Sequence, residues 1–166
     1  RFAGMWSFAI YDHQLKEIFL ARDRFGIKPF YYWFSPDGSF YFASEIKQFT
    51  VLDEWKAKMN PPRVYDYLIY SFTDHTDETL FADVFQLPSG TYFKSSINDI
   101  KPDKSGRIGF SKWYSLKREP FKGTFTEAAE KFRILFENSV REHLYSDVSV
   151  GAALSGGLDS SSIVCE

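Results

Sequence analysis

The sequence predicts a fold that changes class along the chain, from an antiparallel α+β part to the opening of a doubly wound α/β domain. Short aromatic and β-branched segments separated by turn residues fill the first half, which is typical of antiparallel sheets. After about residue 120, a long amphipathic helix leads into an apolar segment and a glycine-rich loop. Helix, strand and loop in this order are the plan of a doubly wound domain. We therefore expect two parts, at residues 1–119 and 120–166.

Four strand candidates open the chain and alternate with turn signals. They cover residues 5–11, 17–21, 29–34 and 39–43. Polar residues follow the first candidate, and Ser-Pro-Asp-Gly follows the third, so tight turns are expected there. We expect these strands to form an antiparallel meander. Because they are apolar on both faces, the sheet should be covered on both sides, by helices or by a second sheet.

Two helices are expected in the middle of the chain. Ser44 can cap a short helix over residues 45–49. Pro61 and Pro62 favour the first turn of a second helix, which should run to Ser71.

Further strands surround the turn sequence Leu-Pro-Ser-Gly at residues 87–90. One candidate spans residues 80–84 and the other includes Tyr92 and Phe93. Residues 95–111 are polar and contain proline and glycine, so this stretch predicts a loop.

The second part opens with a clear helix start. Thr124 and Glu127 match the capping-box spacing, and apolar residues then recur every three or four positions as far as Leu144. An apolar segment at 148–154 follows and predicts a strand. The run Ser-Gly-Gly-Leu-Asp-Ser-Ser at 155–161 separates this strand from the next helix.

This glycine-rich run is suited to holding phosphate. Glycines let backbone N–H groups turn toward an anion, and the following helix start adds unpaired donors and partial positive charge. The run lacks the lysine and the spacing of a Walker A loop, so amides and the hydroxyls of Ser155, Ser160 and Ser161 must bind the phosphates. Asp159 would oppose an anion unless a cation lies between them, which predicts Mg²⁺. Pyrophosphate release and nucleotidyl transfer to a carboxylate fit this chemistry.

Other candidate sites have simpler explanations. Cys165 has no nearby histidine in the sequence and is interpreted as a packed thiol rather than a nucleophile. The three histidines, His13, His75 and His143, lack metal-ligand spacing. The aromatic run at 30–34 is assigned to the core rather than to base stacking.

The charged run Arg22-Asp23-Arg24 precedes Phe-Gly-Ile-Lys-Pro. We favour a turn held by a salt-bridge network over direct contact with a substrate. Gly26 should supply a positive φ in this turn, and Pro29 should start the next strand.

Composition limits the classes of partner. The 166 residues are 44% hydrophobic and 19% aromatic, which is ample for a core, and the net charge of -2 favours neither nucleic acid nor an anionic membrane. No apolar run approaches the roughly 20 residues that span a bilayer. The single cysteine excludes an internal disulfide and fits a reducing compartment, so we expect a cytoplasmic location. Both ends fall inside apparent elements, and we expect an internal segment of a longer protein.

Five ordered segments carry a family resemblance. They lie at residues 4–12, 21–29, 42–47, 87–90 and 146–161. The first three read Gly-Met-Trp-Ser-Phe-Ala-Ile-Tyr-Asp, Ala-Arg-Asp-Arg-Phe-Gly-Ile-Lys-Pro and Phe-Ala-Ser-Glu-Ile-Lys. Together they resemble the glutamine-hydrolysing asparagine synthetase family over nearly the whole chain.

The resemblance implies two domains. The first would be the C-terminal part of an Ntn-hydrolase αββα sandwich, a type 2 glutamine amidotransferase that releases ammonia. The second would be the start of an ATP-pyrophosphatase-like PP-loop domain, in which Mg-ATP activates aspartate as β-aspartyl-AMP. The implied substrates are aspartate, glutamine and ATP, with no nucleic acid or membrane partner, and a homodimer is kept as a candidate assembly.

The same resemblance assigns site residues. The family's N-terminal cysteine nucleophile and its glutamine-binding residues lie before Arg1, so no catalytic residue is assigned within the chain. Residues that bind aspartate lie beyond Glu166. The residues expected to bind ATP and pyrophosphate are Leu154, Ser155, Gly156, Gly157, Asp159 and Ser160. Asp159 is also expected to contact the metal through Mg-pyrophosphate.

Two alternatives stay open at the level of sequence. A related enzyme with the same domain plan could adenylate another carboxylate and close a β-lactam or a peptide ring. The segment could also be an inactive, truncated interaction module.

Overall fold

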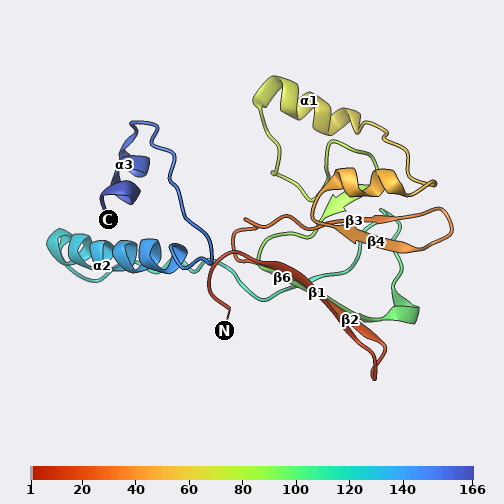
Figure 1. The fold of residues 1–166 in the computed structure, drawn as a ribbon, viewed down its shortest axis with the longest axis horizontal. Helices are drawn as coiled ribbons and strands as arrows, with labels where there is room; N and C mark the ends of the chain where they lie inside the picture. Colours follow the sequence, from red (N-terminus) through yellow and green to blue (C-terminus); the bar gives the residue numbers. More distant parts are fainter. Residues whose placement is uncertain (1) are drawn as a thin grey trace. The chain divides into compact units, whose positions relative to one another are not determined.

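The structure is a computed structural model that describes residues 2–166. It divides into two units: one comprises residues 5–116, and the other comprises 117–166 with the residues before Met5 (Figure 1). Each unit is described by itself. The assignment of residues 1–119 and 120–166 to two domains stays a prediction.

Two antiparallel sheets form the first unit. The larger sheet has the order β1-β2-β6-β7, and the smaller has the order β4-β3-β5. The strands of the larger sheet are β1 (Ser7–Asp12), β2 (Glu17–Arg22), β6 (Thr91–Ser96) and β7 (Ser111–Lys112). Those of the smaller sheet are β3 (Tyr31–Phe34), β4 (Phe40–Ala43) and β5 (Val84–Gln86).

The predicted single meander is wrong. The first four strands form two hairpins, and each hairpin lies in a different sheet (Figure 1). Strand β2 pairs with β6, and β3 pairs with β5, so the central strands take partners from the later part of the chain. Apolar alternation predicts strands, but it does not specify which strand lies beside which.

The main core lies between the two sheets. Leu20 on β2 and Phe93 on β6 pack with Tyr32 on β3 and Phe85 on β5. Burial raises the pKa of the Tyr32 phenol to about 12. The expected cover on one side is therefore a second sheet, and the aromatic run at 30–34 is confirmed as core.

The smaller sheet is covered on its other face as well. Trp33 points away from the main core, because successive strand residues face opposite sides. It packs with Val84, Phe49 and Trp55. Strand β1, in contrast, is half-buried only at its first two residues and is otherwise exposed. The prediction of cover on both faces is thus correct for the smaller sheet and wrong for the outer strand of the larger one.

Two helical segments lie between β4 and β5 in the chain. The 3-10 helix η1 (Ile46–Val51) is capped by Glu45 rather than by the predicted Ser44, because Glu45 and Gln48 form a reciprocal capping box. Helix α1 (Pro61–Tyr70) begins at the two prolines as predicted and ends at Ser71 with φ +57°.

The strand predicted at 80–84 is wrong. The Thr79 hydroxyl accepts a bond from the N–H of Phe81 and donates one of 2.9 Å to the carbonyl of Val84, which folds residues 79–84 into a turn. Strand β5 therefore starts only at Val84. The loop predicted at 95–111 contains the short 3-10 helix η2 (Ile97–Asp99), and β7 after it was not predicted.

The unit that contains residues 117–166 is helical. Helix α2 (Phe125–His143) has the predicted capping box: Glu127 N–H donates to the Thr124 hydroxyl at 3.3 Å, and Thr124 N–H donates to Glu127 Oε2 at 2.7 Å. Helix α3 (Leu158–Cys165) follows the glycine-rich run. None of the described helices is long and apolar enough to cross a membrane.

The strand predicted at 148–154 is not formed, and these residues are exposed. A strand needs a neighbour for its N–H and C=O groups. The described part of the chain offers no other strand within this unit. The apolar pattern alone therefore does not produce a strand here.

The packing between the sheets predicts a clear stability difference between two leucines. Leu20 is 0% exposed and Leu15, in the β1–β2 turn, is 65% exposed. We expect Leu20→Ala to lower the free energy of unfolding by about 3 kcal/mol, because it leaves a cavity in the core. The matched Leu15→Ala should change it by less than about 0.5 kcal/mol. Urea denaturation measures both, and equal losses would contradict the proposed core.

Candidate functional site

The glycine-rich run forms a bent loop at the start of α3. Gly156 has φ +77°, a conformation that glycine adopts without strain. The hydroxyls of Ser155 and Ser160 lie 2.9 Å apart, and Ser160 Oγ donates to the carbonyl of Gly157 at 3.1 Å. The structure therefore brings together three of the residues assigned to phosphate.

The start of α3 keeps its backbone donors available. Gly157 is the N-cap and has no side chain to cap the helix. Among the described residues, the N–H groups of Leu158, Asp159 and Ser160 have no hydrogen-bond acceptor. Such donors and the helix dipole favour an anion at this end.

Asp159 and Leu154, which are also assigned to the site, take no part in the contact between Ser155 and Ser160. The Asp159 carboxylate lies in the first turn of α3 and forms no ion pair with any described residue. Leu154 is 63% exposed. No group of three or more metal-ligating side chains occurs in residues 2–166.

A second polar feature lies in the first unit, where the chain passes from β2 to β3. The Arg22 guanidinium donates to the carbonyls of Gly26, Lys28 and Leu87 at 2.7, 2.9 and 2.7 Å, and to Gln86 Oε1 at 3.0 Å. Gly26 has φ +68°, and a Cβ on it would lie 3.1 Å from the guanidinium carbon. The predicted positive φ is confirmed, and the close approach of the Arg22 side chain also favours glycine.

The neighbouring carboxylate bonds the complementary backbone groups. Asp23 is 1% exposed and accepts bonds from the N–H groups of Trp6, Phe25, Ile27 and Lys28. Burial alone would raise the pKa of Asp23, but these four donors outweigh it and hold the pKa below its ordinary value.

The predicted salt-bridge network at this turn is wrong. Neither Arg22 nor Asp23 forms an ion pair within the described chain. Both side chains bond backbone groups instead, because the chain leaves the sheet here and its polar groups need other partners. Strand β3 starts at Tyr31, two residues after the predicted Pro29.

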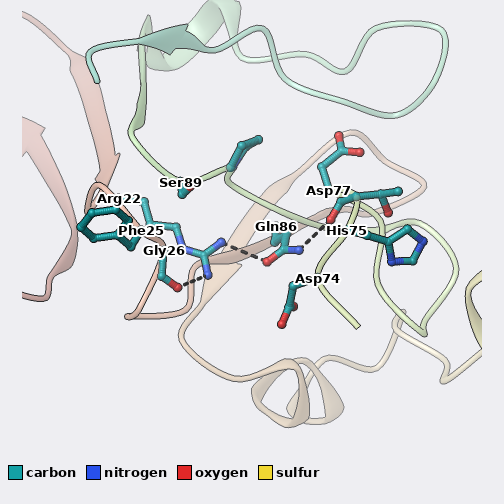
Figure 2. A pocket seen from close by; sticks show the side chains of 10 residues that line it. Arg22, Phe25, Gly26, Asp74, His75, Asp77, Gln86 and Ser89 are labelled. Carbon is teal, nitrogen blue, oxygen red and sulfur yellow. Dashed lines mark hydrogen bonds between the residues drawn. The ribbon is translucent and has the colours of Figure 1, made fainter. Parts of the chain in front are cut away.

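Arg22 also lines a cavity of about 350 Å³ (Figure 2). The residues around it come from the β2–β3 turn, the loop after α1, and the end of β5: Arg22, Phe25, Gly26, Asp74, His75, Thr76, Asp77, Gln86, Pro88 and Ser89. The sequence prediction missed this cavity. The only signal was the density of charge at residues 22–24, and residues 74–77 carry no recognisable pattern.

Two of the histidines make local contacts, and the cysteine differs from its prediction. His143 Nδ1 bonds the carbonyl of Ser139 at 2.7 Å, and His75 lies in a surface network with Arg63 and Asp66. Cys165 was expected to be packed in a helix, but it is exposed in α3.

Comparison with known families gives two matches in chain order. The glutamine amidotransferase domain model matches residues 1–105, and the asparagine synthase model matches residues 131–165. The first match covers more than half of the chain.

The chain belongs to the glutamine amidotransferase domain family. Its two antiparallel sheets, packed face to face, are consistent with the Ntn type of glutaminase in that family. The second match places the glycine-rich loop and α3 in a segment similar to asparagine synthases.

Several relatives of this amidotransferase domain family align along nearly the whole chain. Asparagine synthetase [glutamine-hydrolyzing] 3 of Bacillus subtilis is 33% identical over 96% of the chain and 25% of its own length. A putative asparagine synthetase of Methanocaldococcus jannaschii is 34% identical over 98% of the chain and 30% of its own length. An asparagine synthetase of Pongo abelii is 27% identical over 95% of the chain. The chain thus spans about a quarter to a third of the length of these curated relatives.

The buried carboxylate in this amidotransferase domain predicts a stability loss. We expect Asp23→Asn to lower the free energy of unfolding by about 3 kcal/mol at pH 7, because an amide group would face four N–H donors without the charge that they stabilise. Chemical denaturation measures the loss. The matched Asp53→Asn removes an exposed carboxylate and should leave stability unchanged.

The stability difference between the native protein and Asp23→Asn should depend on pH. The unfolded carboxyl titrates near pH 3.8, and the folded one titrates below it. The stability from Asp23 is therefore fully present above pH 3.8 and is lost as the pH falls through the lower folded pKa. The difference between the native protein and Asp23→Asn should shrink in that acid range. A difference that stays constant down to pH 2 would contradict this assignment.

Proposed function

We propose that the chain is part of a glutamine-dependent asparagine synthetase, which makes asparagine, glutamate, AMP and pyrophosphate from aspartate, glutamine and ATP. One observation carries this proposal: the amidotransferase match at residues 1–105 is followed by the asparagine synthase match at 131–165. An ammonia-releasing domain and a domain that activates a carboxylate are the two parts that such a reaction needs.

The loop at the start of α3 is the proposed ATP and pyrophosphate site. The residues that we assign to it are Leu154, Ser155, Gly156, Gly157, Asp159 and Ser160. The open N–H groups of Leu158, Asp159 and Ser160 support an anion here, and the Ser155 and Ser160 hydroxyls add two short, adjustable donors. Leu154 is assigned to the nucleotide on the resemblance of residues 146–161 to the family.

The residues present fit a magnesium ion that is bound partly by the protein and partly by the substrate phosphates. Mg²⁺ prefers oxygen ligands and is commonly bound through one or two carboxylates together with substrate phosphates. Asp159 supplies one such carboxylate beside the loop. When bound, the ion would neutralise charge on the phosphates, and Asp159 would hold it against the loop.

The chemistry of the reaction explains why this site is needed. A carboxylate does not react with ammonia until one of its oxygens becomes part of a good leaving group. The loop amides and hydroxyls would bind the departing pyrophosphate and stabilise the charge that develops on it. They contribute only positioning and charge stabilisation, and no covalent role is assigned to the chain.

The finer features of the proposal rest on the family alone. We propose that residues 120–166 begin a PP-loop doubly wound domain, and that the protein acts in the cytoplasm. A homodimer is the assembly that we propose to test first.

The proposal predicts the effect of removing Asp159. In the full-length protein, Asp159→Ala should reduce pyrophosphate release by at least about 100-fold, because the phosphate charge would lose its metal contact. Glutamine hydrolysis should stay close to normal. Pyrophosphate release is measured with a coupled assay, and glutamate formation is measured in parallel.

Ser162→Ala provides a matched control. The Ser162 hydroxyl bonds the Leu158 carbonyl within α3 and takes no part in the proposed site. This variant should release pyrophosphate normally. Normal release by Asp159→Ala would remove Asp159 from the site, and absence of aspartate-dependent release in the native protein would reject the proposed reaction.

A further inference from the structure

The cavity beside Arg22 contains a buried cation that forms no ion pair within residues 2–166. Arg22 is 8% exposed, and its hydrogen bonds to the described residues all go to neutral carbonyl oxygens. Burial lowers the pKa of this guanidinium, while nearby carboxylates, including Asp74, oppose that effect. A buried charge gains stability when an opposite charge reaches it.

Three hydrogen-bond donors on the wall remain available. An arginine side chain has five N–H groups, and four of those in Arg22 have acceptors, so one on Nη2 is open. Gln86 is 6% exposed and uses only one amide N–H, which it donates to Thr76. The Ser89 hydroxyl has no acceptor among the described residues. A cation with two neutral donors is a receptor for a carboxylate.

The acidic side chains around the cavity are not equivalent. Asp77 is already paired with Arg107 through bonds of 2.6 and 3.2 Å. Among the described residues, Asp74 accepts only a hydroxyl bond from Thr73, so its carboxylate has acceptor capacity left for a ligand in the cavity that it lines. Figure 2 shows the guanidinium reaching between Gly26 and Gln86, while Asp74 comes from the loop after α1.

We propose that this cavity binds a free α-amino acid, with its carboxylate on Arg22, Gln86 and Ser89 and its ammonium group on Asp74. The volume of about 350 Å³ lies at the small end of the roughly 300–1,000 Å³ of ligand pockets, which fits a ligand of this size. Two carboxylates on the same wall disfavour a phosphate dianion. The site lies in residues 22–89 and uses none of the residues assigned to ATP.

L-alanine is the probe for the test, because it presents both charged groups without a reactive side chain. Saturation-transfer NMR on the full-length protein, without ATP or glutamine, gives its apparent Kd. Acetate has only the carboxylate and methylamine only the ammonium group, so each should bind at least about tenfold more weakly than L-alanine. Because this measurement needs neither ATP nor glutamine, it tests the amino-acid site even if the proposed synthetase reaction is rejected.

Two variants assign the two ends of the ligand. Asp74→Asn should weaken L-alanine binding about tenfold but leave acetate binding unchanged or stronger. Ser89→Ala should weaken both ligands, because it removes a donor to the carboxylate. Both residues are exposed, so the variants spare the bonds of Arg22 on which the fold depends.

Asp53→Asn, at an exposed site away from the cavity, is the matched charge control and should leave L-alanine binding unchanged. The proposal is overturned if L-alanine does not bind, if Asp74→Asn binds it normally, or if inorganic phosphate displaces it at comparable concentration.

Discussion

The first unit depends on the adjacent side chains of Arg22 and Asp23, which bond the backbone between its two sheets. The chain must leave one sheet and enter the other through a bend, where no strand pairs its backbone. The cation bonds the carbonyls of this region, and the carboxylate bonds the N–H groups. Because Arg22 also reaches Leu87, just after β5, this pair joins the ends of both sheets.

This arrangement explains why a polar cavity lies at the end of a strongly aromatic core. Arg22 is held by its bonds to the backbone, so its position does not depend on a ligand. The same rigidity keeps Gln86 fixed by bonds at both ends of its amide, to Arg22 and to Thr76. A wall that is already ordered loses little conformational entropy when it binds a ligand, which favours recognition of small molecules.

Local structure was largely predictable from the sequence, and the choice of partners was not. The capping box at Thr124 and Glu127, the prolines of α1 and the positive φ of Gly26 all follow from short-range chemistry, and the structure has them. The pairing of β2 with β6 depends on residues about 75 positions apart, which no local pattern encodes. The phosphate-type loop could be found because its glycines and serines are contiguous, whereas the cavity combines three distant segments.

The glycine at the start of α3 has a thermodynamic consequence. Helices gain stability, typically about 1 kcal/mol, when the residue at this position has a side-chain oxygen that binds the first N–H groups. Gly157 gives up only a few tenths of a kcal/mol relative to such a residue, because glycine is itself favourable at an N-cap. An aspartate there would make the isolated helix more stable, but its own carboxylate would occupy the donors and repel any incoming anion. The helix start is therefore a place where greater stability and anion affinity exclude each other.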